Sequence, residues 1–392
     1  MVLQAYKKVK ANKGSAGIDE MSWDYLDTHL KSELYKLWNR LTSGSYFPMP
    51  VKQVEIARKD GGIRKLGIPT LLDRIAQEVV KHQLEKQVEP LFHKNSFGYR
   101  PRRNCHEAVA QANSNTFTHD FVIDLDIKGF FDTIDHDLLM KAVRHYCKDE
   151  WVLMYVERWL KAGIVQKDGQ NLKTELGTPQ GGVISPLLAN IFLHVVFDKW
   201  MEKEHHEKPF ERYADDVVVH CKTEKQAEYV LRRITERFQA CKLQLHPIKT
   251  RIVNVRGKSE KKYPQGYDFL GFTIRPNSVQ FKDKIKTVPS IFISTKSRTG
   301  ILKKFKELEL HKRRKPLEEL AMELRPIIRG IMNYYHKFSH GHMHYVWNQL
   351  NVRLLKWVKW EKGLYKYASI RWLKQKYKDQ PRLFPHWELV HP

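Results

Sequence analysis

Three aspartates stand where the sequence predicts buried β-strands. Asp126 lies near the end of the alternating stretch Phe121–Ile127, and the adjacent pair Asp215 and Asp216 precedes the apolar run Val217–Val219. Carboxylates are costly in apolar surroundings unless a cation or hydrogen-bond donors compensate them. Hard divalent cations prefer such oxygen ligands, and two of these ions about 3.5–4 Å apart can catalyse the formation of a phosphodiester bond. The acids therefore indicate a candidate metal site for nucleotidyl transfer.

The same acids have a simpler interpretation that the residues alone leave open. Adjacent aspartates are common in solvated turns, where they bind nothing. Asp124 also lies on the same face of the predicted strand as Asp126, because side chains alternate with a period of two. Spacing alone therefore does not distinguish these two residues as metal ligands.

Short strands and tight turns must position the acids. Val51–Ile68 alternates around a Gly-containing turn and predicts a hairpin, and Phe210–Cys221 predicts a second hairpin around the aspartate pair. The Gly- and Pro-rich segment Gly177–Gly182 predicts a turn that leads into a helix. Ser185 is expected at the N-cap of this helix and Pro186 at its first position.

Helical periodicity accounts for much of the remaining sequence. Helices are predicted over Tyr25–Leu41, Thr70–Val88, Asp137–Tyr146, Glu150–Ala162 and Thr223–Lys242. From Lys296 onward the composition changes to helix, tryptophan and basic charge, with 22 Lys and Arg against 8 Asp and Glu, a net charge of +14. The sequence thus predicts a mixed α+β body of about 295 residues followed by a basic helical module.

Length and charge point to a polyanionic partner. The chain has 392 residues, more than the roughly 250–300 at which a single core stops growing, so several packed parts are expected. Its formal net charge is +25 and its pI is near 9.7. Such an excess favours nucleic acid as the partner. The four cysteines form no C-x-x-C pair, and no apolar run is long enough for a membrane span or a secretion signal. These features predict a cytoplasmic protein.

Several motifs carry a resemblance to a known family. Tyr213-Ala-Asp-Asp216 resembles the signature hairpin of reverse transcriptases. It stands in order among Lys59-Asp-Gly-Gly-Ile-Arg-Lys-Leu-Gly-Ile-Pro69, Ser96-Phe-Gly-Tyr-Arg-Pro101, Asp126-Ile-Lys-Gly-Phe-Phe-Asp132, Gly177-Thr-Pro-Gln-Gly-Gly182, Ser185-Pro-Leu-Leu-Ala-Asn190, Pro247-Ile-Lys-Thr250 and Phe269-Leu-Gly-Phe272. The ordered set resembles the reverse transcriptases encoded by group II introns, which also act as splicing maturases. Arg325–Gly330 and Asn333–Tyr335 resemble the thumb, or maturase X, region of that family.

The resemblance implies a right-hand polymerase fold with fingers, a palm built on a small antiparallel sheet, and a helical thumb. The expected divisions are 1–105 for an N-terminal extension and fingers, 106–295 for the palm with inserted fingers segments, and 296–392 for the thumb or X domain. The family motif places a ligand directly before Ile-Lys-Gly, which favours Asp126 over Asp124. Asp126, Asp215 and Asp216 are then the catalytic acids, holding two Mg²⁺ ions or Mn²⁺ in their place.

The resemblance also implies residues that bind the incoming nucleotide. Phe131 would exclude a 2′-hydroxyl, although a core aromatic beside Phe130 is the alternative. Gln180 would pack against the templating base pair. Arg58, Lys59 and Arg64 flank the fingers hairpin and are candidate triphosphate contacts, because arginine matches phosphate geometry. Arg64 is the stronger candidate, and the alternative for Arg58 and Lys59 is that they only solubilise a turn. Lys249 is a further implied contact, equally compatible with a plain surface lysine.

The implied partners are an intron RNA template, a DNA primer or target, and dNTPs, with no membrane partner and no stated oligomeric state. In the C-terminal module, Leu350, Leu354, Trp357 and Trp360 recur at helical spacing and are expected in a core. The basic residues interspersed with the aromatic residues of this module would face RNA: Lys356, Lys359, Lys362, Lys366 and Arg371.

Four functions remain open from the sequence. The first is an RNA-directed DNA polymerase that also assists splicing and retrohoming, in a bacterial, nucleoid-associated form that lacks the family's endonuclease domain. The second is a non-catalytic RNA-binding splicing factor, although the intact acids and Gln180 argue against it. The third is a host-adopted relative in defence or repair, and the fourth is a nuclease with a similar metal site.

Overall fold

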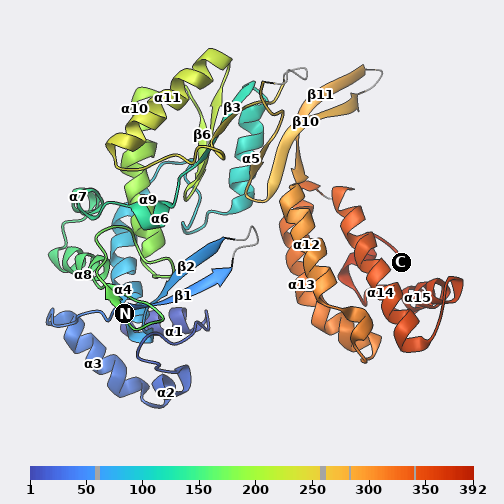
Figure 1. The fold of residues 1–392 in the computed structure, drawn as a ribbon, viewed down its shortest axis with the longest axis horizontal. Coiled ribbons are helices and arrows are strands. Elements are labelled where there is room, and N and C mark those ends of the chain that lie inside the picture. Colours follow the sequence, from blue (N-terminus) through green and yellow to red (C-terminus); the bar gives the residue numbers. More distant parts are fainter. Residues whose placement is uncertain (58–61, 257–261, 282–283, 340) are drawn as a thin grey trace. The chain divides into compact units, whose positions relative to one another are not determined.

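The computed structural model describes all residues except 58–61, 257–261, 282–283 and 340. The chain forms two compact units, each drawn from two segments (Figure 1). The first unit combines Met1–Ala108 with Ile123–Ile252, and the second combines Val109–Val122 with Val253–Pro392. The mixture of helices and small, mainly antiparallel sheets confirms the predicted α+β class.

The sheet that carries the acids has four strands. Their order across the sheet is β6 (Phe210–Tyr213), β7 (Asp216–Cys221), β3 (Phe121–Asp126) and β8 (Arg251–Asn254). β6 and β7 form an antiparallel hairpin in which Tyr213 pairs with Asp216, as predicted. The strand residues next to the acids are buried and apolar: Ile123, Leu125 and Val217–Val219.

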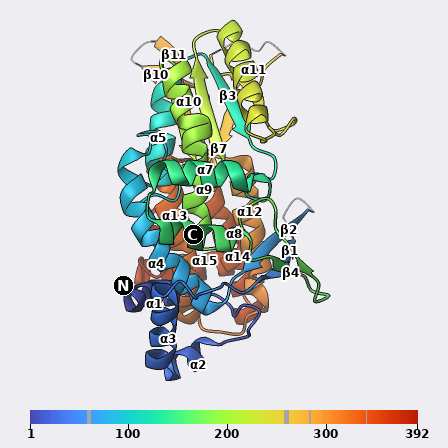
Figure 2. The same ribbon diagram turned by 90° about the vertical axis from the view of Figure 1, so that its left-hand side faces the viewer.

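Helices flank this sheet and continue below it in the view of Figure 2. They are α4 (Leu71–Val88), α5 (Cys105–Thr116), α6 (Phe130–Thr133), α7 (His136–Tyr146), α8 (Glu150–Leu160), α9 (Ser185–Leu193), α10 (Lys199–Glu204) and α11 (Glu224–Ala240). Three of them begin at the side-chain caps that short polar residues provide: Thr70, Asp135 and Thr223. The predicted helices of this region are confirmed within one or two residues at their ends.

The N-terminal region differs from its prediction. The helix expected over Tyr25–Leu41 is two helices, α2 (Trp23–Thr28) and α3 (Leu30–Thr42), and α1 (Val2–Lys10) packs against α3 and α4. The break falls at His29, whose φ and ψ of −105° and 19° are not helical. Its ring nitrogen lies 3.0 Å from the carbonyl oxygen of Tyr25, which also accepts from the His29 amide at 3.1 Å.

A second sheet contains the predicted fingers hairpin. β1 (Val51–Ala57) and β2 (Ile63–Ile68) pair antiparallel from Lys52 opposite Ile68 to Ala57 opposite Ile63. The short strands β4 (Ile164–Val165) and β5 (Asn171–Leu172) extend the sheet beyond β1.

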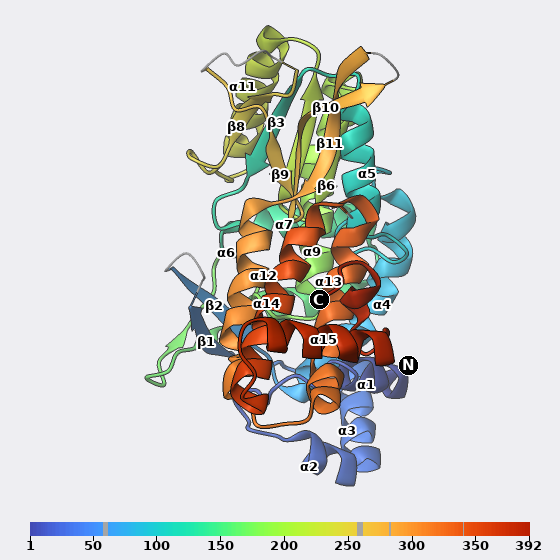
Figure 3. The ribbon, with the colours of Figure 1, turned by 90° about the vertical axis from the view of Figure 1, so that its right-hand side faces the viewer.

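The second unit joins a three-stranded sheet to a helical bundle (Figure 3). Its strands are β9 (Tyr267–Phe269), β10 (Phe272–Phe281) and β11 (Lys284–Ile293), and its helices are α12 (Thr295–Glu307), α13 (Leu317–Ser339), α14 (His344–Lys362) and α15 (Tyr367–Asp379). Trp347, Trp357 and Trp387 are fully buried in the bundle core.

The final residues of the chain complete that core. The Asn351 amide donates to the carbonyl oxygen of Val390 at 3.2 Å, and its oxygen accepts from Trp387 Nε1 at 3.1 Å. Asn351 Oδ1 also lies 2.8 Å from Nε2 of the buried His386, so that nitrogen carries the proton. His386 Nδ1 is buried and has no hydrogen-bond partner among the described residues, so a second proton there would be a buried, unpaired charge. Burial accordingly lowers the pKa of His386 to about 3.

This histidine predicts a pH-dependent stability. Its folded pKa lies below the unfolded value of about 6.5, so its contribution is complete above that pH and decreases as the pH falls toward about 3. We expect the free energy of unfolding to fall by up to about 1.4 kcal/mol more per pH unit in the parent than in His386→Gln. Urea denaturation at several pH values between 7.5 and 5 measures this, with the exposed His145→Gln as control. Parallel pH profiles for the parent and His386→Gln would contradict the assignment.

Among the described residues, no helix combines the length and apolar character that crossing a bilayer requires.

Candidate active site

The aspartate pair sits in a tight turn that other parts of the chain clamp. Ala214 has a left-handed φ of 57°, which turns the chain sharply from β6 into β7. Gly98 lies directly against this turn, because a Cβ atom there would come within 2.5 Å of the Ala214 nitrogen. The Phe97 amide donates to the carbonyl oxygen of Arg212 at 2.8 Å. The motif around Ser96–Tyr99 therefore supports the aspartate hairpin from behind.

Arg212 holds the hairpin from inside the protein. Its fully buried guanidinium donates to both carboxylate oxygens of Asp198, at 2.7 and 2.6 Å, and to Asn190 Oδ1 at 2.9 Å. It also donates to the carbonyl oxygen of Ala214 in the turn, at 3.2 Å. Burial alone raises the pKa of Asp198, but the charge and hydrogen bonds of Arg212 and the hydrogen bond of His194 together outweigh burial and leave that pKa below its ordinary value. Asn190 in turn donates to the Gly98 carbonyl at 2.7 Å, which closes the network.

Asp126 ends β3, beside the strand that Asp216 begins. The segment 246–250 wraps around it: the His246 amide donates to the Asp126 carbonyl at 2.7 Å, and the Asp126 amide donates to Thr250 Oγ1 at 3.3 Å. This arrangement brings Lys249 Nζ within 3.2 Å of Asp126 Oδ2. The structure therefore brings together Asp126 and Lys249, which the sequence had assigned to one site from distant motifs.

Asp124 has different surroundings from Asp126. Its carboxylate accepts from Arg251 Nε at 3.1 Å on the β8 strand, and its side chain is 14% exposed against 39% for Asp126. Asp126 is thus the more accessible of the two acids, and it stands at the end of the strand.

The donor set suits hard divalent cations, because it consists of carboxylate oxygens from two neighbouring strands. Within the part of the chain that the structure describes, no three His, Cys, Asp or Glu side chains lie close enough together to hold a metal ion. Like-charged carboxylates repel one another, and the ammonium of Lys249 compensates Asp126 here.

The Gln180 turn is fixed on two sides. The Gly67 amide of β2 donates to the Gln180 carbonyl at 2.9 Å, and the Thr178 amide donates to the Phe131 carbonyl at 2.7 Å. Gly181 has a φ of 125°, and a Cβ atom there would come within 2.5 Å of the Gly67 carbonyl oxygen, so only glycine fits. The Gln180 side chain is held as well, since its Nε2 lies 3.2 Å from both carboxylate oxygens of Asp132.

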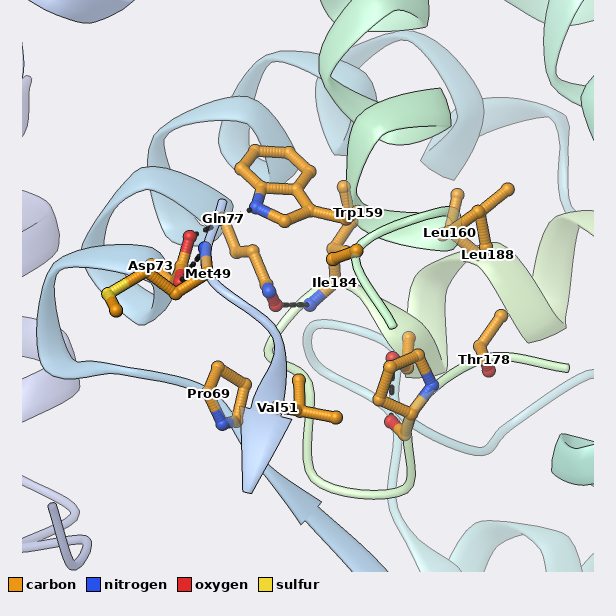
Figure 4. Close-up of a pocket in the computed structure, with 13 residues that line it drawn as sticks. Met49, Val51, Pro69, Asp73, Gln77, Trp159, Leu160, Thr178, Ile184 and Leu188 are labelled. Carbon is orange, nitrogen blue, oxygen red and sulfur yellow. Dashed lines mark hydrogen bonds between the residues drawn. The ribbon is translucent and has the colours of Figure 1, made fainter. Parts of the chain in front are cut away.

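A small cavity of about 10 Å³ lies behind this turn (Figure 4). On one side, the Gln77 side chain accepts from the amides of Val183, at 2.7 Å, and Ile184. Ser185 was predicted as the helix N-cap, and that prediction is wrong: its hydroxyl donates to the Pro179 carbonyl at 2.9 Å. Gln77, from α4, accepts from the amides of the two residues just before the helix, and the Leu187 and Leu188 amides donate to the Ile184 carbonyl.

The other wall of this cavity is a buried carboxylate. Asp73 accepts hydrogen bonds from the Tyr46 hydroxyl, the Thr70 hydroxyl, the Met49 amide and Trp159 Nε1. Burial raises its pKa, although these donors act against the increase. The cluster ties the segment before β1 to α4 and α8, and so supports the turn from behind.

A cleft of about 380 Å³ opens in front of the Gln180 turn. Its lining residues include Phe131 and Asp132, Gln180, and Lys65 and Leu66 of the β1–β2 hairpin. Phe130 is buried while Phe131 is only half-buried, so Phe130 is the core aromatic and Phe131 faces the cleft. Phe131, which lines the cleft, follows Asp126 in the sequence by five residues.

The remaining predicted contacts are distributed as follows. Arg58 and Lys59 lie outside the described residues, and Arg64 pairs with Ile56 in the fingers hairpin. The predicted RNA-binding residues of the second unit are all exposed: Lys356, Lys359, Lys362, Lys366 and Arg371. Trp360 was predicted in the core together with Trp357, and for Trp360 this is wrong, since it is 57% exposed.

Sequence reasoning missed the residues that hold the site in place. Asp132 and Asn190 stood in quoted motifs but received no role, and Arg212 directly precedes the Tyr213 motif. Asp198 and Gln77 carry no local pattern, because each acts on a segment far away in the chain.

The chain belongs to the reverse transcriptase (RNA-dependent DNA polymerase) family, whose model matches residues 56–274, more than half of its length. A second model, the group II intron maturase-specific domain, matches residues 299–378 in the second unit. Reverse transcriptase domains use divalent metal ions.

Relatives and a solved structure agree with this assignment. The chain is 39% identical over 191 residues to the group II intron-encoded protein LtrA of Lactococcus lactis subsp. cremoris, covering 48% of this chain and 32% of that protein. It is 36% identical over 209 residues to the protein YkfC of Escherichia coli (strain K12), covering 52% and 54%. The chain thus matches about a third to a half of these relatives' lengths.

The solved structure is a telomerase from Candida albicans in complex with a fragment of telomeric RNA. Its TM-score is 0.50 at 13% identity, covering 92% of this chain and 70% of the other. This similarity supports the right-hand polymerase fold.

Proposed function

We propose that the protein is an RNA-directed DNA polymerase whose active site contains Asp126, Asp215 and Asp216. The observation that carries this proposal is that Asp126 ends β3 while Asp215 and Asp216 stand at the start of its neighbour β7, and that Phe131, soon after Asp126, lines a cleft of about 380 Å³ together with Gln180. A nuclease needs similar acids, but it does not need this cleft. In this proposal the four-stranded sheet is the palm, the β1–β2 hairpin belongs to the fingers, and the α12–α15 bundle is the thumb.

The three aspartates would hold two Mg²⁺ ions, or Mn²⁺ in their place. When bound, these ions supply activation of the primer 3′-hydroxyl and neutralisation of the triphosphate. Lys249 lies close enough to Asp126 to contact a triphosphate bound there, and could give a proton to the departing pyrophosphate. Phe131 would contact the sugar, and Asp132 would hold Gln180 in the orientation that meets the template base.

The second unit would bind an intron RNA and assist its splicing. The match to the maturase-specific domain and the net charge of +14 from Lys296 onward support this part of the proposal. The proposed partners are therefore RNA as template, a DNA primer or target, and dNTPs.

Primer extension tests the polymerase proposal directly. A DNA primer annealed to an RNA template, with dNTPs and Mg²⁺ or Mn²⁺, should be extended by the purified protein, and EDTA should stop the reaction. If the protein binds the primer–template but extends it with neither metal, it is a non-catalytic RNA-binding protein and the proposal is wrong.

The exposed lysines of α14 predict a salt-dependent RNA affinity. Neutralising Lys356, Lys359 and Lys362 together with glutamine should reduce the slope of log affinity against log salt by about 2, or about 0.7 for each lost phosphate contact. The ratio of the affinity at about 50 mM salt to that at about 200 mM salt should then be about 16-fold smaller for the variant than for the parent. Filter binding to the intron RNA at several salt concentrations measures this slope.

A matched control removes the same charge elsewhere. Lys203, Lys222 and Lys225 are exposed in the first unit, and their triple glutamine variant should retain the parent slope. An identical decrease in both triple variants would mean that net charge, and not the α14 surface, determines RNA affinity.

A further inference from the structure

Three large aromatic side chains are exposed at the junction of α14 and α15. Trp360, Tyr365 and Tyr367 are 57%, 62% and 81% exposed, and the exposed lysines Lys359, Lys362 and Lys366 are interspersed with them. We call residues 359–367 the aromatic turn. An exposed cluster of large rings is unusual on a protein surface and marks a binding site more often than a scattered single residue does.

The three exposed rings are not part of the bundle core. Trp357, one turn earlier in α14, is fully buried, contacts Trp372 at 6.1 Å between ring centroids and donates to the Arg313 carbonyl at 3.1 Å. Trp360 lies in the last turn of the same helix, where its backbone carbonyl accepts from Arg314 at 2.6 Å. Its ring therefore projects from a fixed backbone into solvent.

The backbone of the aromatic turn is itself constrained. Gly363 ends α14 with a φ of 65°, and Lys366 has a φ of 47°, which side-chain-bearing residues rarely adopt. The Ala368 amide donates to the Tyr365 carbonyl at 3.1 Å, and the Ser369 hydroxyl donates to the Lys366 carbonyl at 2.7 Å. The rings flanking this segment thus come from a folded turn and not from an extended linker.

Positive charge accompanies the rings. Lys359 Nζ lies 6.0 Å from the centroid of the Trp360 ring and 5.1 Å from that of the Tyr365 ring, so one ammonium is within cation–π distance of both rings. The acid within the turn, Glu361, is occupied by Arg314 at 3.4 Å and does not cancel this charge. A single-stranded nucleic acid presents flat bases next to a phosphate backbone. Exposed ring faces can stack on such bases while the neighbouring lysines contact the phosphates.

We propose that the aromatic turn binds unpaired nucleotides of RNA by stacking bases on Trp360 and its neighbouring tyrosines, while Lys359 contacts the phosphate. The inference rests on the proposed RNA-binding function and specifies its form, because duplex RNA keeps its bases stacked inside and offers none to these rings. The cores of protein interfaces are depleted of lysine, which favours a nucleic-acid partner over a protein partner.

Substituting Trp360 in the full chain tests this proposal. Trp360→Leu keeps an apolar side chain but removes the ring face, and Trp360→Phe keeps a smaller ring. The probes are a fluorescent single-stranded oligouridylate and a blunt RNA duplex of the same length. We expect Trp360→Leu to weaken binding of the single strand about 5- to 150-fold, with the salt slope and duplex affinity unchanged. Trp360→Phe should recover most of the loss.

Two further variants complete the design. Tyr345→Leu removes a 54% exposed ring near the start of the same helix and should leave both affinities unchanged. Lys359→Gln should reduce the single-strand salt slope by about 0.7. Crosslinking with 4-thiouridine should modify peptides that contain residues 359–367. The melting temperatures of the variants should match the parent, because the replaced side chains are exposed.

Each other outcome overturns the inference. Parent-like affinity in Trp360→Leu, or an equal loss for single strand and duplex, contradicts stacking. A change in self-association or in binding to anionic vesicles, with RNA affinity unaltered, assigns the rings to a protein or lipid partner. If the parent extends primers and binds RNA while Trp360→Leu does the same, only this inference fails. If the parent protein binds neither of the two RNA probes and extends no primer, the proposed function fails together with this inference.

Discussion

Asp215→Ala is expected to reduce primer extension on an RNA template by at least about 10³-fold while leaving RNA affinity within about twofold. The side chain stands in the turn between β6 and β7, in the proposed metal site, and contributes charge there and not packing. Losing one ligand removes several kcal/mol of transition-state stabilisation, and each 1.36 kcal/mol corresponds to about a factor of ten in rate. Single-turnover extension with a prebound primer–template measures the effect on chemistry.

Stability provides a second readout for the same variant. Adjacent carboxylates repel one another, so Asp215→Ala should be at least as stable as the parent toward urea. Asp137→Ala removes an exposed acid from the same unit and should leave extension unchanged. An extension rate for Asp215→Ala within tenfold of the parent would show that this aspartate is not a metal ligand.

Arg212→Met is expected to lower the free energy of unfolding by about 3–5 kcal/mol, because it leaves the buried Asp198 carboxylate without its cation. The aspartate turn should also loosen, since Arg212 is a donor to the Ala214 carbonyl. Urea denaturation measures the first effect, and amide hydrogen exchange of peptides covering 210–221 measures the second.

Two comparisons separate the ion pair from a general effect of losing an arginine. Arg233→Met removes an exposed arginine paired with Glu236 and should cost less than about 1 kcal/mol. Arg212→Met combined with Asp198→Asn removes both charges and should recover part of the loss. If the double variant is no more stable than Arg212→Met, the buried charge is not the cause.

Strands and hairpins around the candidate site were predictable because the pattern that defines them is local. Alternation located β3, and the aspartate pair between apolar runs located the β6–β7 hairpin. The ordered motifs then separated Asp126 from Asp124, which alternation could not do. The structure adds a physical difference between these two acids, since Asp124 is the less exposed and is bound to Arg251.

Contacts between distant segments were not predictable in the same way. Ser185 has the right residue type for an N-cap, but its hydroxyl donates to the Pro179 carbonyl of the preceding turn, and Gln77, more than a hundred residues earlier, binds the amides just before the helix. Arg212 and Asp198 form their pair only after β6 meets the short helical segment His194–Asp198, which directly precedes α10. Residue preference describes what a side chain can do locally, and it does not describe which neighbour arrives from elsewhere.

Trp360 shows the limit of helical periodicity. The spacing correctly placed Trp357 in the core and would place Trp360 beside it. Burial requires another element to cover a helix face, and α14 ends two residues beyond Trp360. Periodicity describes the helix alone, so it gives no information on where the covering elements end.

The two-segment construction of each unit has a consequence for synthesis on the ribosome. β3 emerges before its neighbour β7, so the strand that carries Asp126 has an unpaired edge until residue 221 has left the exit tunnel. The segment Val109–Val122 stays without the rest of its unit for longer still, because that part of the unit starts only at Val253. Unpaired apolar strands are where nascent chains aggregate, so production of this protein should improve when chaperones are supplied.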